Sequence, residues 1–148
     1  MDGKTYTRLC EGSSNTSYFD PIGQCWTVGV GCTGPDIAEG TVWTDDQVSA
    51  AYSKRYSIAQ IGALNDVGRD LWGNLDPVRQ AALTDMAFEI GVGGLAGFPH
   101  MLACVRAGNW QGAHDACLES QYATQVSQRA HRTANMLLTG QWQEGYGG

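Results

Sequence analysis

Two acidic residues near the start of the chain have the residue type and the surroundings of a catalytic pair. Glu11 is followed at once by the helix-stopping Gly12, so it is predicted to end a short helix over residues 3–11. Asp20 opens an Asp-Pro turn before the strand-favouring segment 25–30, which predicts a place at the tip of a hairpin. A helix end and a hairpin tip can hold two carboxyls on opposite walls of a cleft.

Two carboxyls held in this way are what glycoside hydrolysis requires. One protonates the leaving oxygen, and the other activates water or stabilises the sugar cation. A helix end and an exposed turn are contrasting environments, and such a contrast is typical of an acid and a base. The pattern also has a plain structural explanation, because Glu before Gly is common at helix ends and Asp-Pro commonly opens turns. The pair alone leaves both interpretations open.

A longer pattern around these acids resembles a known family. The pattern E-G-x5-Y-x-D-x2-G-x3-T-V-G-V-G, at residues 11–31, is similar to the active-site segment of the phage-type lysozymes. That family is glycoside hydrolase family 24, which includes the T-even phage lysozymes and their tail-associated relatives. Later segments resemble the family's helical lobe, in the same order: A-A-L-T-D-M-A-F-E-I-G-V-G-G-L-A-G-F at 81–98, S-Q-R-A-H-R at 127–132 and L-T-G-Q-W at 138–142.

The resemblance implies a fold class. The expected fold is α+β and mainly α, with a lysozyme-like arrangement of a small β-sheet lobe and a larger helical lobe joined by a long helix. The chain is predicted to be a single lysozyme-like domain over residues 1–148. Its small lobe is expected over about residues 12–50, and its helical lobe over residues 1–11 plus 51–148.

The resemblance also implies an activity and a role for each catalytic residue. It implies a muramidase that cleaves the β-1,4 bond between N-acetylmuramic acid and N-acetylglucosamine in peptidoglycan, with inversion. Glu11 would be the general acid, Asp20 the base, and Thr27 a helper that holds the attacking water. This chain has one more residue between Asp20 and Thr27 than the family usually has. We expect the turn to absorb it, because V-G-V-G follows Thr27 as it does in the family.

Further residues are predicted to bind substrate or support the site by the same resemblance. Arg129 matches an arginine that anchors the catalytic acid through a charge-assisted bond. Asp85 and Glu89 stand where relatives often carry amides, and their carboxylates could accept the same hydrogen bonds from sugars; the alternative is a solvated helix face. Tyr18 and Phe88 could line the cleft or could belong to the core.

Local signals predict the remaining elements. Thr44 and Gln47 form a capping-box pattern before a long amphipathic segment, which predicts one connecting helix or two with a break near Ser57. Two strands are expected within residues 17–31, and residues 34–41 are a candidate third strand. The other helices are predicted over residues 77–90, 98–107, from Asn109 onward, and 128–138.

Composition limits the partners. The net charge is −6 and no basic stripe is present, so nucleic acid is not expected as a partner. No apolar run approaches the roughly 18 residues of a membrane-spanning helix, and the N-terminus lacks the apolar core of an export signal, so no membrane partner is expected. No cofactor is expected either. The expected partner is bacterial peptidoglycan, and the chain is expected to be a monomer unless it is part of a phage tail assembly.

The five cysteines are predicted to be free thiols. Cys25 and Cys32 are read as residues of one extended strand, about 23 Å apart, which is beyond the roughly 7 Å limit for a disulfide. Cys104 and Cys117 lie among small apolar residues and are expected to be buried and inert. A Cys10–Cys32 bridge is the most plausible exception. The spacing of Cys104 to His100 and of Cys117 to His114 could mimic that of metal ligands. No metal is predicted, because packed thiols explain the pattern better.

Other functions share most of these features. The chief alternative is a catalytically inactive, lysozyme-like module that binds cell wall or has a structural role in a phage particle. A transglycosylase would need the acid but no base to activate water. The expected location is the host cytoplasm when the protein is made, or the phage virion, with action on peptidoglycan in the periplasm or cell wall.

Overall fold

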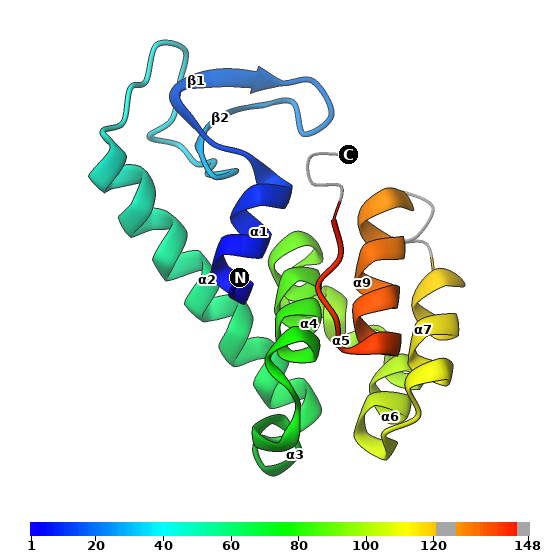
Figure 1. Cartoon of the computed structure of the whole chain (residues 1–148). Coiled ribbons are helices and arrows are strands. Elements are labelled where there is room, and N and C mark those ends of the chain that lie inside the picture. The colour runs from blue at the N-terminus through cyan, green and yellow to red at the C-terminus, as the bar shows by residue number, and fades with distance from the viewer. Residues whose placement is uncertain (121–126, 145–148) are drawn as a thin grey trace.

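The computed structural model describes residues 1–120 and 127–144. It is mainly helical, with a small antiparallel hairpin at the N-terminal end of a long helix (Figure 1). The elements in chain order are α1 (Gly3–Glu11), β1 (Ser14–Asp20), β2 (Cys25–Gly29), α2 (Asp45–Val67), α3 (Arg69–Asn74), α4 (Pro77–Ile90), α5 (Val92–Ala96), α6 (Pro99–Ala107), α7 (Trp110–Leu118) and α9 (Ser127–Thr139). The mainly-α, α+β fold class predicted from the sequence is confirmed.

The hairpin of β1 and β2 forms the small sheet. Asp20 pairs with Cys25 and Tyr18 pairs with Thr27, and the one irregularity in register lies further along, between Ser14 and Tyr18. The ladder is therefore regular from the turn to Thr27, and the turn contains the extra residue, as expected. The segment 34–41 is not a third strand, because in the described residues only isolated bridges extend the two-stranded sheet, between Thr16 and Val42 and between Val28 and Cys32.

The chain reverses immediately after β2. Gly29 and Gly31 have φ values of +65° and +70°, a backbone conformation that favours glycine, and they return Cys32 to pair with Val28. The prediction that Cys25 and Cys32 share one extended strand is therefore wrong. All five cysteines are nevertheless free, so neither that pair nor Cys10–Cys32 is bridged. Cys104 and Cys117 are buried as predicted.

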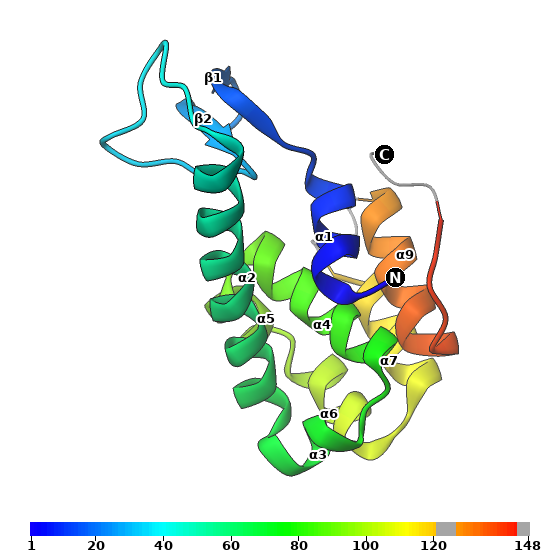
Figure 2. The ribbon, with the colours of Figure 1, turned by 60° about the vertical axis from the view of Figure 1, so that its left-hand side comes forward.

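The long helix α2 begins at the predicted capping box. Thr44 accepts from the backbone N–H of Gln47 at 3.2 Å, and the Gln47 side chain accepts from the backbone of Thr44 at 2.8 Å. The helix continues without a break at Ser57 and ends where Gly68 adopts a φ of +105°. The helix extends from the small sheet to the far end of the helical region, as Figure 2 shows. Within the described residues, no helix has both the length and the apolar composition needed to span a bilayer.

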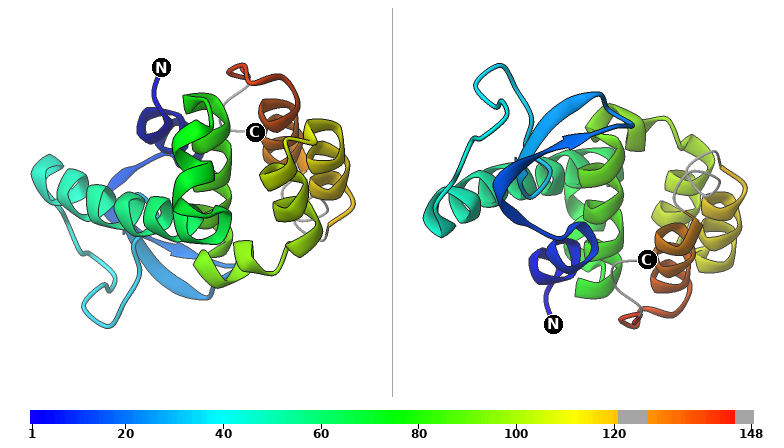
Figure 3. Two further views of the ribbon diagram at one scale, coloured as in Figure 1. Left: turned by 90° about the horizontal axis from the view of Figure 1, so that it is seen from below. Right: turned by 90° about the horizontal axis from the view of Figure 1, so that it is seen from above.

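The helix α4 is the centre of the core. It begins with Asp76 as N-cap and Pro77 in the first turn, as predicted, and it is buried almost continuously from Val78 to Phe88. Seen along the axis of the molecule in Figure 3, α4 lies between α2 on one side and the group of α6, α7 and α9 on the other. The first helix, α1, also packs against α4. One buried helix thus contacts the elements that carry both ends of the chain.

Candidate active site

Glu11 is the last residue of α1, and Gly12 ends the helix with a φ of +72°. The Glu11 side chain is 22% exposed, so one of its faces is open to solvent. Its Oε1 accepts a hydrogen bond from Nη1 of Arg129 on α9, at 3.0 Å. The contact that the family resemblance predicts between these residues is present. It fixes the carboxyl at the end of α1 against the helical core.

Arg129 contacts three carboxylates at once. Its Nε and Nη2 donate to the two oxygens of Asp85 at 3.0 and 2.8 Å, in a bidentate pair. Its Nη1 bonds Glu11 and also forms an ion pair with Glu89. Asp85 and Glu89 lie one turn apart on α4, which places both on the face toward α9. We define Glu11, Asp85, Glu89 and Arg129 as the arginine cluster.

The arginine cluster holds more negative than positive charge in a buried place. Burial raises the pKa of Glu89, Arg129 acts in the opposite direction, and the charges of Glu11 and Asp85 raise that pKa further. Burial alone would lower the pKa of Arg129, but the bonds to Asp85 and the charges of Glu11 and Glu89 raise it overall. The guanidinium is therefore a permanent cation, and burial makes Glu89 easier to protonate than an exposed glutamate.

Asp85 is placed differently from the sequence expectation. Its side chain is fully buried, and the hydroxyl of Thr7 on α1 donates to its Oδ1 at 2.6 Å. With both oxygens bonded to Arg129 and one also to Thr7, Asp85 does not present a free acceptor to a sugar. It is not on a solvated helix face either. In this structure it anchors Arg129 and joins α1 to α4. Glu89, 19% exposed, remains at the edge of the cluster.

The second carboxyl lies on the hairpin. Cross-strand pairing places Asp20 and Cys25 on the same face as Tyr18 and Thr27. Asp20 is half-buried, and its Oδ1 accepts from the backbone N–H of Ile22 at 3.0 Å, which holds the carboxyl at the turn. We call this set of four residues the hairpin face. It collects the acid, the phenol, the hydroxyl and a thiol on one side of the sheet.

Tyr18 relates the two carboxyls to each other. Its side chain is 47% exposed, and burial of the remainder raises the pKa of its hydroxyl. The charges of Asp20 and Glu11 both raise that pKa further. The phenol therefore lies within electrostatic reach of both acids. The two carboxyls come from different elements, and both raise the pKa of the same phenol.

Thr27 is almost fully buried at 4% exposed. Its Oγ1 has no hydrogen-bond partner within residues 1–120 and 127–144. A buried hydroxyl without a protein partner is uncommon and often marks a place where a ligand or water is bound. Its position opposite Tyr18 keeps it on the same face as Asp20.

Arg55 is a residue near the site that sequence reasoning missed. It extends from α2, donates to the backbone carbonyl of Val30, and stacks over the ring of Phe88 with its Cζ 4.4 Å from the centroid. Phe88 is 7% exposed and belongs to the core, although it also lines a pocket of about 250 Å³ together with Arg55. A lone arginine on a long helix carries no sequence signal for such a place. Arg55 ties the small lobe to α4.

One protein family matches most of the chain. The family model for phage lysozyme matches residues 8–135, which include Glu11, Asp20, Thr27 and Arg129. The chain belongs to the phage lysozyme family. The mainly helical α+β fold is the phage-type lysozyme fold that the sequence predicted.

One relative of this phage lysozyme chain is a phage pre-baseplate protein. The chain is 42% identical over 77 residues to the pre-baseplate central spike protein Gp5 of Enterobacteria phage T4. The matched stretch is 52% of this chain and 13% of the length of that protein.

Within the described residues no group of three or more His, Cys, Asp or Glu side chains is arranged to hold a metal ion.

Proposed function

We propose that this phage lysozyme family member is a muramidase, a peptidoglycan hydrolase that cleaves the β-1,4 bond between N-acetylmuramic acid and N-acetylglucosamine by an inverting acid/base mechanism. One observation carries the proposal. Glu11 is held by Arg129, and Asp20 is held by the hairpin turn, so the two acids come from separate elements. The charges of both raise the pKa of the Tyr18 hydroxyl. Two carboxyls from separate elements are the minimum that glycoside hydrolysis requires.

In this mechanism each residue has one task. Glu11 donates its proton to the glycosidic oxygen as the bond to the sugar breaks. Asp20 accepts a proton from the water that attacks the opposite face of the sugar, and the unpartnered hydroxyl of Thr27 helps to orient that water. Inversion needs about 6.5–9.5 Å between the two carboxyls to leave room for the water. Tyr18 on the hairpin face and Glu89 in the arginine cluster would contact the sugars.

A turbidity assay on purified sacculi, followed by mass analysis of the products, tests the proposal. Hydrolysis gives products with hydrated reducing ends, whereas a transglycosylase gives anhydro ends. Glu11→Gln should lower the rate by 10²–10⁴-fold or more while leaving the melting temperature near that of the wild type, since it removes the proton and keeps the shape. Glu39→Gln, the same change at an exposed loop acid, is the matched control and should cleave normally.

The rival proposal is an inactive module of a phage particle that binds cell wall without cutting it. It is favoured by one observation, the likeness to a pre-baseplate central spike protein. Wild-type protein that binds sacculi but releases no soluble fragments would support this rival. For the muramidase we propose a place in the virion or in the infected host, with action on the cell wall.

A further inference from the structure

One nitrogen of the arginine cluster serves two carboxyls. Asp85 takes the bidentate pair formed by Nε and Nη2 of Arg129. Only Nη1 is left for the other two acids, and it contacts both Oε1 of Glu11 and Oε2 of Glu89. The charge of Asp85 matches the single positive charge of the guanidinium. The charges of Glu11 and Glu89 are therefore in excess when both groups are ionised.

The shared nitrogen also limits the distance between these two carboxyls. Each of the two oxygens lies 3.0 Å or less from Nη1, so the oxygens are no more than about 6 Å apart. Two like charges at that distance disfavour each other, and such a pair takes up one proton that belongs to both groups. The gap is also short enough for a proton to cross through one water.

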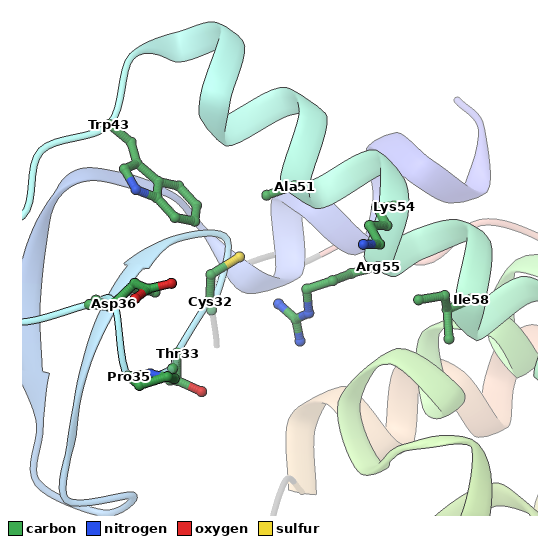
Figure 4. Close-up of a pocket in the computed structure, with 12 residues that line it drawn as sticks. Cys32, Thr33, Pro35, Asp36, Trp43, Ala51, Lys54, Arg55 and Ile58 are labelled. Atoms are coloured by element: carbon green, nitrogen blue, oxygen red, sulfur yellow. The ribbon is translucent and has the colours of Figure 1, made fainter.

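Glu11 connects the arginine cluster to the open side of the site. Its Oε1 is bonded to Arg129, whereas its Oε2 lies toward Gly31, where an added Cβ would be 4.0 Å from that oxygen. Gly31 lines a pocket of about 500 Å³ between α2 and the loop that follows β2 (Figure 4). One oxygen of the acid therefore faces the cluster, and the other faces the pocket side.

The charges that act on Glu89 come from three helices. Burial raises its pKa, Arg129 on α9 acts in the opposite direction, and Glu11 on α1 and Asp85 on α4 raise it further. The side chain of Glu89 is 19% exposed, so it can exchange a proton with solvent. Of the two carboxyls that share Nη1, each therefore makes a proton on the other more favourable.

The other cations near α4 are directed elsewhere. Arg55 on α2 donates to the carbonyl of Val30 and lines the pocket in Figure 4. Arg132 on α9 contacts the thiol of Cys10 at 3.9 Å. The short helix α5, which also packs on α4, has no charged residue. Arg129 is thus the cation that acts on Glu89.

We propose that Glu89 is the proton partner of the catalytic acid, and that Glu11 and Glu89 hold one proton between them across Nη1 of Arg129. This inference rests on the muramidase function proposed above. Before cleavage the proton is on Glu11, and Glu89 is ionised. After Glu11 has given the proton to the glycosidic oxygen, both groups are carboxylates. Glu89 then takes a proton from solvent and passes it to Glu11. Because relatives often carry an amide at this position, the pair is a feature of this chain.

The pH dependence of cleavage tests this pair. The rate constant kcat/KM is measured on soluble peptidoglycan fragments for the wild type, Glu89→Gln and Glu39→Gln. Glu89→Gln keeps the shape and the carbonyl acceptor of the side chain but removes the second charge. The alkaline limb of its profile should move to lower pH by about 1 unit. The limb should not move in Glu39→Gln, the same change at an exposed loop acid.

A role of Glu89 in sugar binding alone gives a different result. The amide would then change KM by the same factor at every pH, and the alkaline limb would stay where it is in the wild type. That outcome, or a shift of the limb to higher pH, overturns the proposal.

A titration without substrate separates this failure from failure of the muramidase proposal. ¹³C NMR of the side-chain carboxyl carbons follows both groups over the acidic and neutral pH range. In the wild type Glu11 and Glu89 should titrate in the same two steps, because they share a proton. In Glu11→Gln, Glu89 should titrate in one step with a midpoint about 1 pH unit lower, since a charge that raises its pKa is gone. An unchanged midpoint rejects the shared proton. Coupled titration in a protein that cleaves nothing supports the pair and rejects the muramidase.

Discussion

Replacing Arg129 by Met should show how much of the free energy of unfolding depends on the arginine cluster. The change removes the cation that neutralises Asp85, which is fully buried, and leaves Glu11 and Glu89 without their shared partner. Removing one partner of a buried ion pair costs about 3–5 kcal/mol. For a chain of this length, 1 kcal/mol changes Tm by about 2–4 °C. We therefore expect a lower free energy of unfolding by about 3–5 kcal/mol and a Tm lower by about 6–20 °C.

The pH dependence of this loss has a definite sign. In Arg129→Met the pKa values of the buried carboxyls rise above their unfolded values, because no cation remains beside them. Ionised carboxyls then destabilise the folded state at neutral pH, and the penalty fades as the pH falls through the raised pKa values. Urea unfolding at several pH values should show the deficit shrinking toward pH 4. The double variant Asp85→Asn/Arg129→Met should recover a large part of the loss, because no buried charge is left at position 85.

Arg106→Met is the matched control for that experiment. Arg106 is an exposed helix arginine that donates to the backbone carbonyl of Asp66 at 2.8 Å. Its replacement should cost no more than about 1 kcal/mol. If Arg129→Met were as mild as this control, or if its deficit were the same at pH 4 and pH 7, the idea that one guanidinium compensates a buried group of carboxylates would be wrong.

The remaining predictions concern Glu89 and the thiols. Glu89→Gln should raise Tm at pH 7, because a carboxyl whose pKa is raised by burial destabilises the fold when it is ionised. This gain in Tm should vanish near pH 4. A lower Tm at pH 7 would mean that the ion pair with Arg129 outweighs the effect of burial. Thiol titration without reductant should find five reactive groups after denaturation, and three would indicate a disulfide. In the native protein Cys117 should react last, since burial raises its pKa to about 12. Half-buried Cys25 should react early and its modification should reduce cleavage, and Cys25→Ser should prevent that loss.

Elements with local signals could be predicted from the sequence. The capping box at Thr44, the Asp76-Pro77 start of α4 and the glycine after Glu11 each fix a helix end through hydrogen bonds between near neighbours. The contact between Glu11 and Arg129 spans most of the chain, and only the family resemblance predicted it. The regular ladder between Asp20 and Thr27 follows from placing the extra residue in the turn.

Features that depend on packing between distant segments could not be predicted. Asp85 is buried because α1 and α9 both cover that face of α4, and no pattern within the helix reports this. The sequence predicts a continued strand after β2, whereas the chain reverses there. Its two glycines could have indicated a turn. The place of Arg55 between Val30 and Phe88 is set by the distance between lobes, which a single sequence does not contain.

The hairpin turn has a consequence for how this site can evolve. Asp20 is the last residue of β1, and the four residues that follow it, 21–24, are all exposed. A change of length there would alter the turn whose Ile22 N–H holds the carboxyl, and it would change no buried side chain. Under the proposed function, the spacing of the two carboxyls decides between inversion and retention. Relatives with turns of different length could therefore differ between inversion and retention while their core sequences stay the same.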